Sequence, residues 1–148
     1  MLSFTDVLNL VPPSKRKNAR LPGIYSLTWL PIAAGASNQP ATLTTQNSSD
    51  FIALQLKAYV TSTAAPPVET TAPQLTMTIT VGSNNYTVDN IGIPVGAFSS
   101  SASERRPFLF SFPWYIERNT TLTATLTSLF NADLNVRIFL EGIRIMNA

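Results

Sequence analysis

The chain of 148 residues is 45% apolar and only 12% charged, and it contains neither cysteine nor histidine. This length fits one domain, and the apolar fraction is sufficient for a hydrophobic core, which excludes wholesale disorder. Without these two residue types the chain has no disulfide, no thiolate or histidine metal site, no cysteine nucleophile and no Ser-His-Asp triad.

The net charge of +2 is unevenly distributed along the sequence. Residues 1–20 carry four basic side chains and one acid, whereas residues 21–148 carry six basic and seven acidic side chains. The four basic residues are Lys15, Arg16, Lys17 and Arg20. Prolines and a glycine surround this cluster, so we expect residues 1–23 to form an extended basic arm with a short helical turn at 5–10. We expect residues 24–148 to form a single domain.

The N-terminus does not have the pattern of a signal peptide, and no apolar run approaches the ~18–20 residues that span a bilayer. We therefore expect a soluble protein that makes no contact with membranes. The absence of cysteine leaves the redox compartment open.

Alternating apolar and polar residues predict about eight β-strands, and no segment of a dozen residues shows helical periodicity. The expected strands are residues 24–30, 41–46, 50–60, 75–81, 86–88, 107–112, 120–129 and 134–146. The expected connections include long loops at 61–74 and 99–106, a hairpin turn at 82–85, an irregular edge at 89–98 and a corner at 113–119. Strands without alternating helices are typical of an all-β fold, and we predict an antiparallel, jelly-roll-like β-sandwich.

The pattern within the strands predicts which residues face the core. Thr-rich strands place Leu75, Met77, Ile79 and Val81 inward, and likewise Leu122, Ala124 and Leu126. In the strand at 50–60, the inward residues are expected to be Ile52, Leu54, Leu56 and Val60, which places Phe51 and Tyr59 on the polar side. In the last strand Val136, Ile138 and Leu140 should face inward, and the change of parity after Gly142 predicts a β-bulge there.

The eight acidic side chains do not form an evident catalytic pair. Asp50, Asp89 and Asp133 lie in turn contexts where carboxylates bond backbone amides, and Glu69 and Glu104 lie in loops. A calcium site at Asp89 and Asn90 would lack the usual Asp-rich loop pattern. We expect turn and surface carboxylates, no cofactor, no metal and no enzymatic activity.

Two groups of residues are candidates for contacts with partners. The basic cluster Lys15, Arg16, Lys17 and Arg20 fits a solvated arm, an arm docked on an acidic neighbour, or a weak nucleic-acid contact, although it lacks interleaved aromatics. Trp114 and Tyr115 end a dense aromatic run that begins with Phe108, Phe110 and Phe112, and Trp29 lies in the first strand. These rings would fill the sandwich, anchor a protein interface or stack on sugars.

Two stretches of the sequence resemble small β-sandwich virion proteins of tailed bacteriophages, over about half of the chain. The matching residues are Ala34 and Gly35, Asp50 and Phe51, Pro113–Ile116, Thr121–Leu129, and Val136–Ile145 with Gly142. The resemblance implies capsid decoration, a minor capsid role, or a neck or tail component, and location in the virion after synthesis in the host cytoplasm. It does not distinguish these positions.

The first functional hypothesis is therefore a non-enzymatic virion structural protein in many copies, contacting major capsid, portal or neck subunits and its own copies. Its partner-binding residues would be Lys15, Arg16, Lys17, Arg20, Trp29, Trp114 and Tyr115. The alternatives are a carbohydrate-binding module that uses the tryptophans and Tyr115, and a small-virus shell protein whose arm contacts the genome.

Overall fold

The computed structural model describes residues 4–70, 74–82, 84–85, 93–95 and 108–147. Within these residues the chain is almost entirely β-structure, with one short helix, α1 (Phe4–Asn9), and a single 3-10 turn, η1 (Pro13–Lys15). The strands are β1 (Arg20–Ile32), β2 (Gln39–Thr44), β3 (Ser49–Ser62), β4 (Leu75–Val81), β5 (Asn84–Asn85), β6 (Ile93–Pro94), β7 (Phe108–Ile116), β8 (Thr121–Ser128) and β9 (Leu134–Met146).

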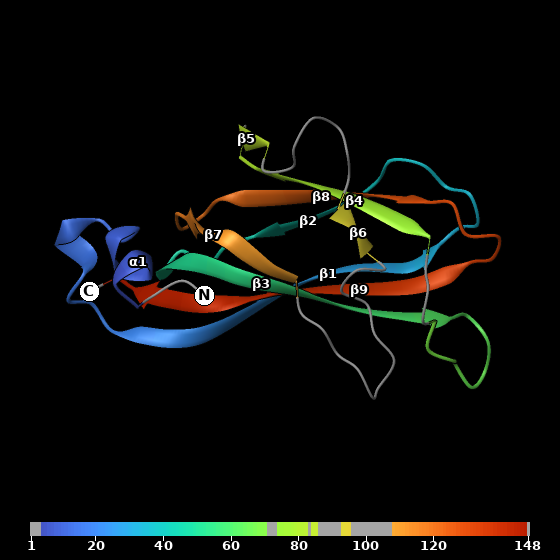
Figure 1. The fold of residues 1–148 in the computed structure, drawn as a ribbon, viewed down its shortest axis with the longest axis horizontal. Helices are drawn as coiled ribbons and strands as arrows, with labels where there is room; N and C mark the ends of the chain where they lie inside the picture. Colours follow the sequence, from blue (N-terminus) through green and yellow to red (C-terminus); the bar gives the residue numbers. More distant parts are fainter. Residues whose placement is uncertain (1–3, 71–73, 83, 86–92, 96–107, 148) are drawn as a thin grey trace.

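The described strands form two stacked antiparallel sheets, β1-β9-β3-β7 and β2-β8-β4-β5, with β6 also paired to β4 (Figure 1). The chain pairs from its ends inward: β1 with β9, β2 with β8, β3 with β7, and β4 with β5 and β6. These nested pairs form one long antiparallel hairpin, which rolls up so that β3 also pairs with β9 and β4 with β8. This order is that of a jelly roll, which confirms the predicted sandwich.

The core lies between the two sheets and follows the period-two pattern of the strands. All the apolar residues predicted to face inward on β4 and β8 are buried, and so are Val136, Ile138 and Leu140 of β9. The intervening threonines of β4 and β8 are partly exposed on the opposite face. Alternation in these strands therefore decides their burial, because successive side chains point to opposite faces of a sheet.

The facing pattern predicted for β3 is wrong at its N-terminal end. Phe51 is completely buried in the core, whereas Leu54 is only partly buried and packs on the outer side of the sheet. The register shows the reason, because Ala53 is opposite Gly142 while Gln55 is opposite Glu141, which leaves Leu54 as an extra residue. This bulge in β3 reverses the direction of the side chains that precede it.

Gly142 is the point at which β3 and β9 approach most closely. A Cβ atom at Gly142 would lie 1.8 Å from the carbonyl oxygen of Ile52 and 3.1 Å from the ring of Phe51. The bulge predicted in β9 at this glycine is wrong, because β1 and β9 stay in continuous register from Arg20 to Trp29 and the extra residue belongs to β3. Glycine is needed in β9 because another backbone approaches it closely.

The N-terminal segment differs from a fully extended arm. The predicted helical turn is confirmed as α1, but residues 20–23 belong to β1, where they pair with residues 142–145 of β9. Residues 4–19 lie at the end of the sandwich where β9 ends (Figure 1). Val11 is 2% exposed and packs with Ile52 and Ile145 on the outer face of the sheet. This small second core explains the change of parity along β9.

Two other predictions are changed by the structure. The corner expected at 113–119 is wrong, because β7 continues to Ile116 and residues 114–116 pair with residues 51–53 of β3. The hairpin turn at 82–85 is confirmed by the pairing of Thr80 with Asn85. Most of the predicted strand at 86–88, of the irregular edge at 89–98 and of the loop at 99–106 lies outside the described residues.

Candidate interaction surfaces

A buried carboxylate connects the N-terminal segment to the outer face of the sheet. Asp50 begins β3 and is completely buried, and its Oδ2 lies 2.5 Å from the Nζ of Lys15 in η1. The hydroxyl of Tyr115 in β7 donates to the same Oδ2, and the backbone N–H of Arg118 donates to Oδ1 at 3.0 Å. Three donors from separate parts of the chain therefore converge on one acid.

These donors decide the ionisation of the centre. Burial alone would raise the pKa of Asp50, but the hydrogen bonds from Lys15, Tyr115 and Arg118 and the positive charge of Lys15 outweigh it, so the pKa lies below its ordinary value. For Tyr115, burial and the hydrogen bond to the Asp50 carboxylate raise the pKa of the phenol. Asp50 therefore stays ionised and Tyr115 stays protonated at neutral pH, which suits a structural ion pair.

The prediction for the acidic residues is corrected at Asp50, which is neither in a turn nor on the surface. It is confirmed at Asp133, whose Oδ1 accepts a hydrogen bond from the N–H of Ala34 at 2.9 Å. The calcium candidates Asp89 and Asn90, and the loop residue Glu104, lie outside the described residues. Among the described residues, no three acidic side chains are grouped as a metal site requires.

The basic cluster is largely used to fold the N-terminal segment back on itself and on the sheet. Lys15 pairs with Asp50, the Nε of Arg16 donates to the carbonyl of Val11 at 3.1 Å, and Arg20 donates to the carbonyl of Arg16 at 2.7 Å. The N–H of Met146 in β9 donates to the carbonyl of Ala19 at 2.9 Å. Arg16 and Lys17 remain exposed to solvent. Whether the cluster contacts a partner stays a prediction.

The candidate aromatic residues differ in accessibility. Trp29 is 6% exposed in the core, and its indole N–H donates to the carbonyl of Gln39 at 2.9 Å. Trp114 is half-buried and stacks on Phe110, with ring centroids 4.1 Å apart, and Phe110 itself is buried as expected. The side chains of Phe108 and Phe112 lie outside the described residues. The burial of Trp29 removes its ring from the surfaces that would stack on a sugar.

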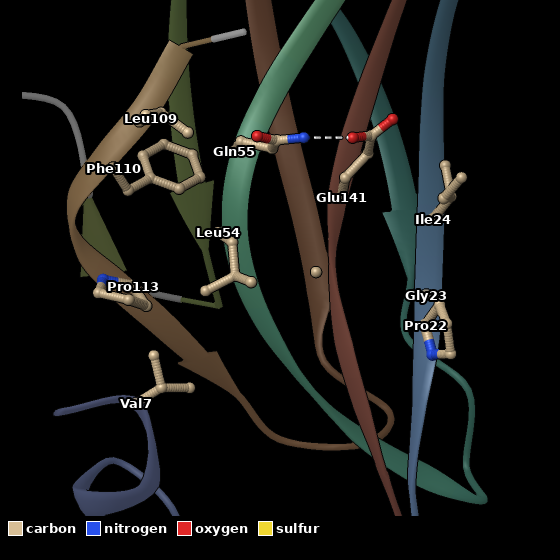
Figure 2. Close-up of a pocket in the computed structure, with 11 residues that line it drawn as sticks. Val7, Pro22, Gly23, Ile24, Leu54, Gln55, Leu109, Phe110, Pro113 and Glu141 are labelled. Atoms are coloured by element: carbon tan, nitrogen blue, oxygen red, sulfur yellow. Dashed lines mark hydrogen bonds between the residues drawn. The ribbon is translucent and has the colours of Figure 1, made fainter. Parts of the chain in front are cut away.

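A groove of about 890 Å³ opens on the outer face of the β1-β9-β3-β7 sheet, beside α1 (Figure 2). It exists because β7 bows away from β3: Trp114 pairs with Ala53 and Leu109 pairs with Gln55, so residues 110–113 of β7 lie opposite Leu54 alone. The groove is lined by Val7, Pro22, Gly23, Ile24, Leu54, Gln55, Leu109, Phe110, Pro113, Glu141 and Gly142.

One polar group lies on the floor of this apolar groove. Glu141 accepts a hydrogen bond from the side-chain amide of Gln55 at 2.5 Å, which Figure 2 shows, and its Oε2 lies 2.9 Å from the Nζ of Lys57. Burial alone would raise the pKa of Glu141, but the bonds from Gln55 and Lys57 lower it below its ordinary value. The groove therefore offers apolar walls and a carboxylate whose charge is already neutralised.

The sequence pattern did not reveal this groove. Leu54 was predicted to face the core, so its position on the outer face depends on a bulge that alternation does not indicate. Two glycines, Gly23 and Gly142, lie directly opposite each other on β1 and β9 at the groove floor. Their presence in otherwise regular strands was the available signal, because glycine inside a strand marks a bulge or a close approach.

Comparisons with known proteins give the fold but no family. No family model matches the sequence, and no curated protein matches it. None of the helices in the described residues has the length and apolarity that a membrane crossing requires. Among solved structures, a chain of the "Cyanophage Pam1 capsid asymmetric unit" is similar, with a TM-score of 0.51, 14% sequence identity and coverage of 86% of each chain. The protein therefore shares its fold with a chain of a cyanophage capsid.

Proposed function

We propose that this protein is a non-enzymatic structural component of a virus particle, which builds or decorates the capsid or neck of a tailed bacteriophage. The observation that carries the proposal is the nested jelly-roll pairing of the strands, together with the likeness to a cyanophage capsid chain over 86% of both chains. Jelly rolls are frequent in viral capsids. The identity of 14% ties the two proteins by fold, so the role rests on the fold and on the surfaces of this chain.

The chemistry of the side chains supports contact rather than catalysis. The chain has no histidine or cysteine, which are the usual general bases and nucleophiles near neutral pH. The two carboxylates with lowered pKa values, Asp50 and Glu141, are each engaged by a lysine of the same chain. Perturbed carboxylates in this protein therefore serve the packing of the sheet.

Contacts with other virion proteins would use surfaces that the fold leaves open. Among the residues predicted from the sequence, Arg16 and Lys17 are exposed and suit an acidic neighbour. Lys15, Trp29 and Tyr115 have defined roles inside the chain, as the ion pair, the core indole and the donor to Asp50. We propose the exposed side of the N-terminal segment as one attachment surface.

The test is the composition of purified particles of the phage whose genome carries this sequence. The chain should be present in many copies per particle by quantitative mass spectrometry, and it should remain through a density gradient. The charge-reversed variant Arg16→Glu with Lys17→Glu should be incorporated less, whereas the matched change of exposed Arg118 to Glu should have little effect. A chain confined to the soluble fraction of the lysate would contradict the proposal.

A further inference from the structure

The outer face of the β1-β9-β3-β7 sheet combines a hollow with exposed apolar side chains. Ile24 on β1 is 65% exposed and Leu109 on β7 is 68% exposed, and both line the groove (Figure 2). They come from the two edge strands of the sheet, so they lie on opposite sides of the hollow. Apolar groups gathered around a concave surface mark a place where another molecule is bound.

The charges beside the groove are compatible with a dry contact. Glu141, the acid on the floor, is already paired with Lys57 at 2.9 Å and with Gln55 at 2.5 Å. A partner that covers it does not bury an isolated charge, which would be costly. A paired carboxylate also provides no net charge to attract a strongly basic or acidic partner. An apolar, weakly charged surface is therefore the best complement.

The size of the face fits a pair of protein subunits. Strands spaced about 4.8 Å apart with a rise of about 3.4 Å per residue give four strands of this length a face of roughly 800 Å². A standard interface buries about 800 Å² on each partner. Part of the face is covered by the N-terminal segment, whose Val7 also lines the groove, so this segment belongs to the same surface.

We propose that this face binds a second copy of the same chain about a two-fold axis, with Leu109 of each copy entering the groove of the other. A two-fold contact uses the same patch on both subunits, so one patch must carry both the projecting and the receiving elements. This face carries both, because Leu109 and Ile24 project at the edges and Leu54 and Gly142 line the hollow between them. The proposed virion role does not require such a pair, so the inference goes beyond it.

Sedimentation velocity of the full chain over a wide concentration range tests the contact. The protein should self-associate, and Leu109→Asp should weaken the association by about tenfold or more, because a charge would enter an apolar groove. Leu109 is exposed, so the variant should keep the circular dichroism spectrum and cooperative unfolding of the parent. The matched control is Leu129→Asp, which is 71% exposed just after β8, on the other sheet, and should associate normally.

The lack of cysteine permits a second, independent measurement. Leu109→Cys, treated with a short bifunctional thiol reagent, should form a covalent dimer, whereas Leu129→Cys should remain a monomer under the same conditions. A chain that stays monomeric at every concentration, or an association that Leu109→Asp does not weaken, would overturn the proposed face. Presence of the chain in purified particles would still stand in that case, so the two proposals fail separately.

Discussion

Two acidic residues on the β1-β9-β3-β7 sheet are paired with lysines in different ways. Asp50 is completely buried and bonds Lys15, Tyr115 and the N–H of Arg118. Glu141 lies beside the open groove and bonds Lys57 and Gln55, with 21% of its side chain exposed. At the first site the chain covers its own sheet with residues 4–19, whereas at the second the sheet surface remains open.

The comparison separates a structural contact from an available surface. The ion pair of Asp50 anchors the N-terminal segment over Ile52 and Ile145, so that part of the apolar surface is covered within the chain. The groove around Glu141 has a comparable apolar lining, but Ile24 and Leu109 remain exposed there. The variants below probe this difference, from the largest expected effect to the smallest.

Replacing Asp50 with Ala should have the largest effect. It removes the common acceptor of Lys15, Tyr115 and Arg118, and leaves the donors without a partner in a buried site. Breaking a buried ion pair from one side costs about 3–5 kcal/mol of unfolding free energy. Denaturant unfolding measures the loss, with exposed Glu117→Ala as the control, expected within about 0.5 kcal/mol of the parent. A loss below about 1 kcal/mol would show that the two acids are equivalent.

Gly142→Ala tests the close approach of β3 and β9 between the two regions. The new Cβ would meet the backbone oxygen of Ile52 at 1.8 Å, and backbone cannot move aside as a side chain does. Overpacking costs about 1–3 kcal/mol, and we expect the upper part of this range in thermal or denaturant unfolding. Gly23→Ala is the matched control, because its nearest neighbour is the flexible Arg144 side chain. Equal losses for the two variants would contradict the structure.

Acidification should destabilise the protein through the same pair of acids. The folded-state pKa of Asp50 is lowered, so the unfolded chain binds a proton first as the pH falls. The stability from Asp50 is fully present above its unfolded pKa of about 3.9 and is lost as the pH falls through the lower folded value. Asp50→Asn should flatten the acid limb of unfolding free energy against pH more than Glu141→Gln, because Asp50 is fully buried. The reverse order would remove the distinction drawn between the two acids.

The smallest effect is expected at the groove. Lys57→Ala removes an ion pair in which the side chains are 39% and 21% exposed, so solvent screens most of the interaction. Such pairs contribute about 0.2–1 kcal/mol, and the loss should shrink further in high salt. Denaturant unfolding at low and high salt measures this, with the neighbouring exposed Arg137→Ala as the control. A loss as large as that of Asp50→Ala would mean that the groove is a structural site.

The strands and their turns could be predicted because their information is local. β4 and β9 were predicted with the bounds that the structure shows, since alternation and turn residues act over a few positions. The jelly roll followed from the number and spacing of such strands. The predicted partner-binding residues were chosen from charge and aromatic content alone, and these do not reveal that Trp29 is buried or that Lys15 is engaged within the chain.

By itself the sequence determined an all-β chain with a basic N-terminal segment, no histidine or cysteine, and the inward faces of its regular strands. Only the tertiary structure decided where Phe51, Leu54 and Asp50 lie. A single extra residue in β3 reverses its facing pattern, and the partners of Asp50 are 35 and 65 residues away in sequence. Contacts between such distant residues depend on how the sheets roll together, which period-two alternation within one strand does not encode.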